Sequence, residues 1–67
     1  MVYDLTYREQ EIVYLISMGF SSKEIAQKLF ISKETVRSHR KNIFIKMDAR
    51  NVAGLVRRAF ENKILEI

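Results

Sequence analysis

The stretch ISKETVRSHRKNIFIKM, residues 31–47, has the spacing of an amphipathic helix and carries five cations. On a helical wheel, Val36, Ile43 and Met47 fall on one side, and His39 and Arg40 lie at the edges of that side. Ser32 is a suitable N-cap, so the stretch predicts a helix over about 33–47. The side opposite the apolar residues is predicted to face outward and collects Glu34, Arg37, Ser38, Lys41 and Ile45.

The positive charge of the chain is concentrated in the same stretch. The whole chain has a formal net charge of +4. Residues 33–46 hold five cations against the single acid Glu34, which gives this segment alone a charge of +4. A local basic field favours a polyanionic partner such as nucleic acid. An ordinary solvated helix face is the alternative that charge by itself leaves open.

Cap residues predict two helices before this one. Thr6 with Glu9, and Ser21 with Glu24, have the spacing of capping boxes. Gly19 is suited to the left-handed residue that follows a helix. We therefore predict helices over about 7–18 and 22–29. Apolar residues at helical spacing support both, with Ile12, Val13, Leu15 and Ile16 in the first and Ile25, Ala26 and Leu29 in the second.

A fourth helix is predicted over about 52–62. Asn51 can cap it, and Asp48 before it tolerates the left-handed conformation better than most residues. Gly54 inside it costs about 1 kcal/mol relative to Ala. Its apolar residues are expected to face inward, and they are Val52, Leu55, Val56 and Ala59.

Length and composition limit the fold class. A chain of 67 residues is expected to be a single domain, residues 1–67. The sequence has no cysteine and no proline and only two glycines, which argues against a disulfide framework and against a β-sandwich. We predict an all-α four-helix bundle. No apolar run approaches the roughly 20 residues of a membrane span, and the N-terminus does not resemble a signal peptide, so we expect a soluble intracellular protein without a membrane partner.

The sequence has no pattern typical of an enzyme active site or of a metal site. His39 is the single histidine, and no carboxylate stands at ligand spacing from it, so no metal site is expected. Ser38 and His39 are adjacent and point apart on a helix, so they do not form a nucleophile–base pair. We therefore predict no catalytic residue, no cofactor and no enzymatic activity.

The second and third predicted helices are joined by a turn of about three residues, which is helix-turn-helix spacing. In such a motif, side chains near the N-terminal half of the second helix reach base edges in the major groove of DNA. Arg37 and Lys41 can donate to guanine O6 and N7, and Ser38 can donate or accept. These three residues are the base-reading candidates.

Phosphate contacts are predicted mainly at helix N-termini, where backbone N–H groups attract anions. Ser22 and Lys23 open the second helix, and Thr35 lies in the first turn of the third. His39 and Lys46 are further candidates along the third helix. Capping and solubility are an equally good account of Ser22 and Lys23.

The segment LTYREQEIVYLISMGFSSKEIAQKLFISKETVRSHRKNIFIKM, residues 5–47, resembles the LuxR-type (GerE-like) helix-turn-helix domain of bacterial transcription regulators. The shared pattern is LTxRExEV, a Gly between the first two helices, KEIAxxLxIS and then TVxxHxxNIxxKL. The resemblance implies a DNA-binding domain whose third helix enters the major groove. Its base-reading positions fall on Arg37, Ser38 and Lys41, and its phosphate-contacting Thr falls on Thr35.

The resemblance also implies a homodimer formed through the last helix, with Val52, Leu55, Val56 and Ala59 as its apolar residues. Double-stranded DNA is the expected partner, and RNA polymerase is a further candidate. The expected location is the bacterial cytoplasm, at the nucleoid. The chain departs from the family pattern at Asp48, Val52 and Gly54, which lie at or beside this dimer element.

Three alternatives remain open. The promoter-reading domain of sigma factors resembles the EIA and TV segments, but it usually carries Arg at the position of His39. A protein-interaction module could keep the same fold and dock a partner through Phe44, Ile45 and the fourth helix, although Arg37 and Lys41 argue against it. A non-specific nucleic-acid binder is disfavoured by the modest total charge.

Overall fold

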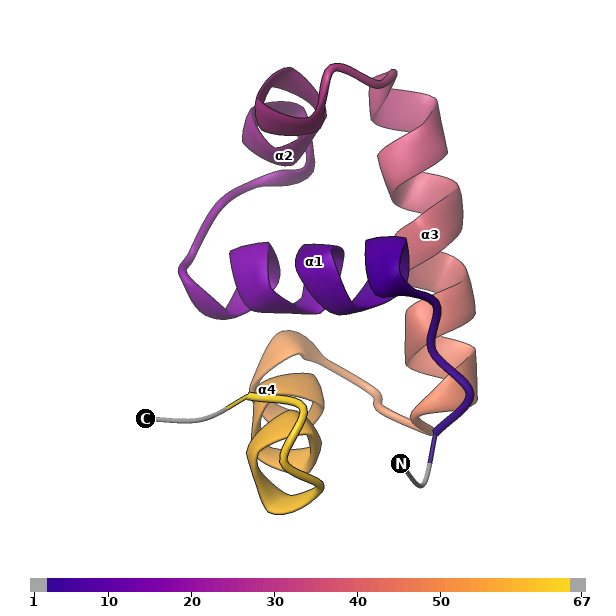
Figure 1. The fold of residues 1–67 in the computed structure, drawn as a ribbon, viewed down its shortest axis with the longest axis vertical. Coiled ribbons are helices and arrows are strands. Elements are labelled where there is room, and N and C mark those ends of the chain that lie inside the picture. The colour runs from indigo at the N-terminus through magenta and orange to yellow at the C-terminus, as the bar shows by residue number, and fades with distance from the viewer. Residues whose placement is uncertain (1–2, 66–67) are drawn as a thin grey trace.

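The computed structural model describes residues 3–65, which form four helices and no strand (Figure 1). The helices are α1 (Tyr7–Ser17), α2 (Ser22–Leu29), α3 (Lys33–Lys46) and α4 (Val52–Glu61). The predicted all-α four-helix architecture is confirmed; α2 has the predicted bounds, and the other three helices end one residue earlier than predicted. No helix within residues 3–65 combines the length and the apolar character that crossing a membrane requires.

Each helix begins at the cap residue that the sequence predicts. The side chains of Thr6, Ser21, Ser32 and Asn51 accept hydrogen bonds from the backbone N–H three residues later, at 3.1, 3.2, 3.0 and 2.8 Å. The first two caps are complete capping boxes, because the carboxylates of Glu9 and Glu24 accept hydrogen bonds from the backbone N–H groups of Thr6 and Ser21, each at 2.9 Å. Local hydrogen bonding therefore sets where the helices start.

The four helices also end in the same way, with a residue of positive φ after the last turn. These residues are Gly19, Phe30, Asp48 and Lys63, with φ of 91°, 57°, 51° and 60°. In each case the N–H of the next residue reaches back to a carbonyl five residues earlier, as Phe20 does to Leu15 at 3.2 Å and Ala49 does to Phe44 at 3.0 Å. This is the Schellman ending, and the residue that makes the bond packs against the core.

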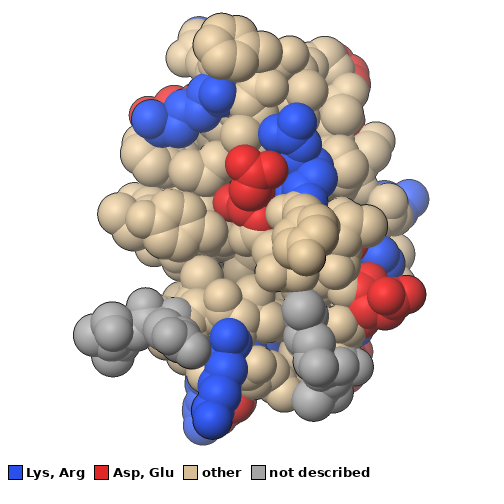
Figure 2. All heavy atoms as spheres, in the orientation of Figure 1, with Lys and Arg blue, Asp and Glu red and all other residues tan. Residues whose placement is uncertain are grey.

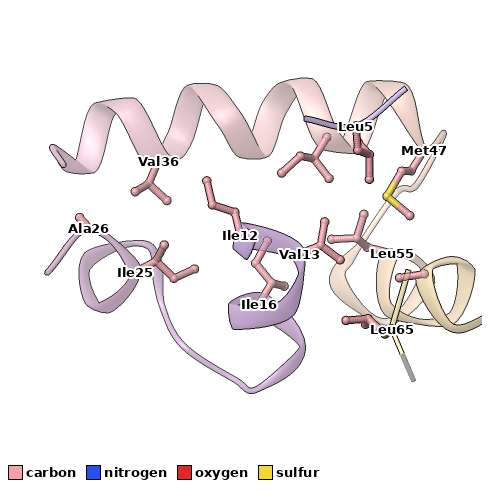
Figure 3. Close-up of a cluster of buried hydrophobic side chains, with 12 residues drawn as sticks. Leu5, Ile12, Val13, Ile16, Ile25, Ala26, Val36, Met47, Leu55 and Leu65 are labelled. Carbon is pink, nitrogen blue, oxygen red and sulfur yellow. The ribbon is translucent and has the colours of Figure 1, made fainter. Parts of the chain in front are cut away.

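The core lies where α1 meets the other three helices (Figure 3). Ile12 of α1 lies close to Ile25 of α2 and Val36 of α3, and Val13 of α1 points toward Leu55 of α4. The buried apolar residues are Leu5, Ile12, Val13, Ile16, Ile25, Ala26, Val36, Ile43, Met47, Leu55, Ala59 and Leu65. In Figure 1, α1 runs between α2 and α4, and α3 passes along the side of the molecule.

One inward-facing prediction for α4 is wrong. Val52 is 42% exposed, because it opens the helix at the edge of a surface hollow that Phe20 and Arg40 also line. Leu55 and Ala59 are fully buried as predicted, and Val56 is half-buried. Arg58 ties the helix to the end of α3 by donating to the Met47 carbonyl at 3.2 Å.

Candidate nucleic-acid interface

The outward side of α3 carries the predicted base-reading residues. Arg37, Ser38 and Lys41 are all exposed, while Val36 and Ile43 on the opposite side of the same helix are fully buried. α3 packs on both α1 and α2 through that buried side. The core therefore holds the helix in one orientation and leaves the three polar side chains free to contact a ligand.

The N-terminus of α2 offers hydrogen-bond donors. The capping box of Ser21 and Glu24 satisfies the N–H of Glu24 and that of Ser21. The N–H groups of Ser22 and Lys23 are left without an intrahelical acceptor, as at any helix start. Together with the half-buried Ser22 hydroxyl and the exposed Lys23 ammonium, they make this end of α2 suited to an anion.

At the start of α3, Thr35 is bound into the cap. Its N–H donates to the Ser32 hydroxyl at 3.0 Å, and the two hydroxyl oxygens are 2.7 Å apart. One hydroxyl hydrogen of the pair is used between them, and the other remains for an outside acceptor such as a phosphate oxygen. Both residues are exposed.

The edges of α3 hold His39 and Arg40, both half-buried. Arg40 lies with its guanidinium carbon 5.8 Å from the centre of the Phe44 ring, and it lines a hollow beside Ser21 and Ser22. Arg40 was predicted only as an edge residue, yet the structure brings it to the N-terminus of α2. Within residues 3–65, no group of three or more His, Cys, Asp or Glu side chains is placed to hold a metal ion.

Lys46 lies on a different side of α3 from the outward residues. Its Nζ is 2.8 Å from Oε1 of Glu9 in α1, and the Glu9 residue is only 3% exposed. Burial raises the pKa of the Glu9 carboxyl, but hydrogen bonds from Lys46 and Thr6 outweigh it and hold that pKa below its ordinary value. Lys46 is thus paired within the protein, and its phosphate contact stays a prediction.

The face of the molecule seen in Figure 2 carries charges of both signs. In the view of Figure 2, basic and acidic side chains adjoin one another over α1 and its surroundings. That face shows no continuous basic patch. The cations of residues 33–46 belong to α3, which lies along one side of the view.

α4 carries an apolar ridge beside its buried row. Val52 and Phe60 are 42% and 41% exposed, and Val56 between them is half-buried. Their spacing of four residues places them in one line along the helix. Leu55 and Ala59, which were predicted with the dimer helix, are used by the core of this chain. Phe60 was missed by sequence reasoning, although it continues the four-residue spacing of Val52 and Val56.

Phe44 and Ile45, the docking residues of the alternative interaction module, differ in exposure. Phe44 is half-buried beneath Arg40, and Ile45 is 67% exposed. A separate exposed aromatic ring, Phe30, projects from the turn between α2 and α3 with 94% of its surface exposed. Ile45 lies in α3 and Phe30 in the turn after α2, so neither residue belongs to the apolar ridge of α4.

The fold and this surface define a helix-turn-helix domain in which α2 and α3 are the two helices of the motif. The sequence profile of the family described as bacterial regulatory proteins, luxR family, matches residues 3–59. The chain belongs to that family, and it is a DNA-binding domain of a transcription regulator. The predicted resemblance is confirmed.

Similar proteins agree with this assignment. The oxygen regulatory protein NreC of Staphylococcus haemolyticus is 42% identical over 62 residues, which are 92% of this chain and 29% of NreC. The transcription factor GerE has a TM-score of 0.85 and 32% identity, with 92% of each chain covered. The response regulator ChrA of a heme-sensing two-component system has a TM-score of 0.86 and 33% identity, covering 91% of this chain and 30% of ChrA.

A fourth similar protein was solved together with DNA. The VqmA–ligand–DNA complex of Vibrio cholera has a TM-score of 0.85 and 25% identity, and the match covers this whole chain and 29% of VqmA. This chain therefore spans less than a third of the length of NreC, ChrA and VqmA.

Proposed function

We propose that this domain reads specific double-stranded DNA sequences by placing α3 in the major groove. The observation that carries the proposal is the exposed set of Arg37, Ser38 and Lys41, directly opposite the buried side of the same helix. An α-helix fits the major groove, and Arg and Lys side chains there donate to guanine O6 and N7. A core-held helix presents these donors in one orientation, which base recognition requires.

The phosphate contacts support the same docking. The open N–H groups at the start of α2, with Ser22 and Lys23, suit one phosphate. Thr35 suits another at the start of α3, and His39 is a candidate farther along that helix. Contacts of this kind orient a protein on the duplex without reading sequence. Lys46 is the weakest member of the predicted set because Glu9 already holds its ammonium.

The domain is proposed to bind DNA as a homodimer. The ridge of Val52, Val56 and Phe60 on α4 supports this, since it is apolar, exposed and outside the core. A two-fold dimer would engage two half-sites about 10 base pairs apart. Binding would take place at the nucleoid, in the cytoplasm, and we propose RNA polymerase as a further partner.

We also propose that residues 1–67 form one domain that serves as the DNA-binding part of a regulator of the ChrA or NreC kind. Both of those proteins extend well beyond the matched region. In a regulator of that kind, this domain would supply the DNA-binding residues, and other parts of the longer protein would sense the signal. The domain itself needs no cofactor and no catalytic residue for this role.

Selection from a randomised duplex pool at near-physiological salt tests the function. The wild-type chain, Arg37→Ala, Lys41→Ala and the control Arg57→Ala are compared; Arg57 lies on α4 with its side chain 80% exposed. Wild type is expected to recover a motif with paired half-sites. Arg37→Ala and Lys41→Ala are each expected to cost about 1–3 kcal/mol and to relax preference at particular base pairs. Arg57→Ala should recover the wild-type motif.

Two results would contradict the proposal. Equal weakening of Arg37→Ala and Lys41→Ala on every sequence would show that these residues contact phosphate and do not read bases. Recovery of no motif by the wild-type chain, with binding that disappears as salt is added, would favour the protein-interaction module instead.

A further inference from the structure

Glu34 shares the outward side of α3 with the base-reading candidates. It is exposed, and it precedes Arg37 by three residues and Ser38 by four, so it stands one helical turn before them. With 3.6 residues per turn, Glu34, Arg37, Ser38 and Lys41 fall within an arc of about 100°. The rise from Glu34 to Lys41 is about 10 Å, which corresponds to roughly three base-pair steps of DNA.

The carboxylate of Glu34 is not neutralised within the described structure. The ion pairs found within residues 3–65 join Arg8 to Glu11, Lys46 to Glu9, and Arg57 to Glu61, and none of them involves Glu34. An acid in the first turn of a helix is favoured by the helix dipole, which is sufficient reason for it to be tolerated there. That effect does not require the acid to stand in the same outward arc as Arg37 and Lys41.

An acid on a helix docked in the major groove meets the base edges as well as the phosphates. Cytosine offers its N4 amino group as a donor and no neighbouring acceptor on that edge. Guanine presents two acceptors, O6 and N7, which repel a carboxylate, and adenine and thymine each present an acceptor beside the position that Glu34 would take. A carboxylate therefore selects cytosine and rejects guanine, whereas the cations beside it do the opposite.

We infer that Glu34 is a specificity-determining residue that accepts a hydrogen bond from the N4 amino group of a cytosine. The inference rests on the proposed function, because it needs α3 in the major groove. It predicts an ordered readout along the helix, with a cytosine contacted from the N-terminal end and guanines contacted by Arg37 and Lys41 farther along. Glu34 also disfavours sites with guanine in place of that cytosine, through repulsion.

The experiment repeats the selection from the randomised pool with wild type, Glu34→Gln and Glu34→Ala. The control is Glu11→Gln on α1, which removes the same charge from a side chain that is 56% exposed. Wild type is expected to prefer cytosine at one position of each half-site by about five- to tenfold, the lower part of the range for a base contact. Glu34→Gln should shift that position toward adenine, because an amide pairs with adenine N6 and N7.

Glu34→Ala should leave the position without preference and the rest of the motif unchanged, and Glu11→Gln should recover the wild-type motif. If all four chains recover one identical motif, and the Glu34 variants merely bind every sequence more tightly, the inference is overturned while the proposed function stands. If wild type recovers no motif, the proposed function fails, and this inference fails with it. Thermal unfolding of each variant separates a change of preference from a loss of folded protein.

Discussion

Lys46 and Glu9 are 37 residues apart in the chain, and their side chains meet at 2.8 Å. The Glu9 oxygen that receives the Lys46 ammonium also accepts the backbone N–H of Thr6, at 2.9 Å. One carboxylate thus completes the cap of α1 and joins the first turn of that helix to the last turn of α3. The side chain of Glu9 is only 5% exposed, so little water competes with either hydrogen bond.

Replacing Lys46 by Met is expected to destabilise the fold. The change leaves a nearly buried carboxylate without its charged partner, for which we expect a loss of about 1–2 kcal/mol in the free energy of unfolding. Urea unfolding measures it. A double-mutant cycle with Glu9→Gln should give a coupling of at least about 0.5 kcal/mol. If Lys46→Met keeps full stability but lowers the salt dependence of DNA binding, Lys46 contacts phosphate after all.

The same carboxylate makes stability depend on pH. Because the pKa of Glu9 is lower in the folded than in the unfolded chain, protonation favours unfolding. The stabilisation is complete above the unfolded-state pKa of about 4.3 and is lost as the pH falls through the folded-state value. Glu24 acts in the same direction, since hydrogen bonds from Ser21 lower its pKa.

Unfolding free energies measured from neutral pH to below about pH 4 should therefore fall more steeply for wild type than for Glu9→Gln. Each titration uses urea at constant ionic strength, and the difference between the two curves isolates Glu9 from Glu24. Parallel curves for the two proteins would contradict the assignment of a lowered pKa to Glu9.

The two glycines are expected to respond oppositely to alanine. A Cβ at Gly54 meets only the Asn51 side-chain oxygen, at 3.4 Å, so Gly54→Ala should stabilise α4 by up to about 1 kcal/mol. Gly19 has a φ of 91°, so Gly19→Ala should destabilise by about 1 kcal/mol or more, although nothing lies within 4 Å of its Cβ position. Urea midpoints of both variants provide the measurement; a destabilising Gly54→Ala would show that the Asn51 cap cannot adjust.

Substitutions at Leu55 and at Val52 should distinguish an effect on folding from an effect on dimerisation. Leu55 is fully buried, so Leu55→Ala is expected to cost about 2–5 kcal/mol of stability. Val52→Ala should change stability by less than about 1 kcal/mol, because the side chain is largely outside the core. It should weaken binding to a duplex with two half-sites more than binding to one half-site. Equal weakening on both duplexes would contradict a dimer contact at Val52.

The helix boundaries could be predicted closely because their causes are local. The caps at Thr6, Ser21, Ser32 and Asn51 each act over three residues, and the sequence displays both partners of each bond. The outward side of α3 was also predictable, since a wheel needs only the spacing of Val36, Ile43 and Met47.

Other features depend on contacts between distant segments. The pairing of Lys46 with Glu9 follows from how α1 crosses α3, which no local pattern records. The exposure of Val52 follows from the hollow that it lines with Gly19 and Phe20, which follow α1. Phe30 takes a left-handed conformation that sequence statistics assign to Gly or Asn, and here a Schellman ending imposes it on an exposed aromatic residue.

α1 lies between α2 and α4, and α3 passes along the side of the molecule (Figure 1). The helix that carries the base-reading candidates and the helix that carries the apolar ridge both pack on α1, and Arg58 of α4 also donates to the Met47 carbonyl at the end of α3. The bases preferred within a half-site would depend on the exposed side chains of α3. In the proposed dimer, the distance between the two copies of α3 would depend on how α4 packs on α1, and so on interior residues such as Val13, which points toward Leu55. A substitution in this core would therefore change the preferred half-site spacing without changing the preferred bases.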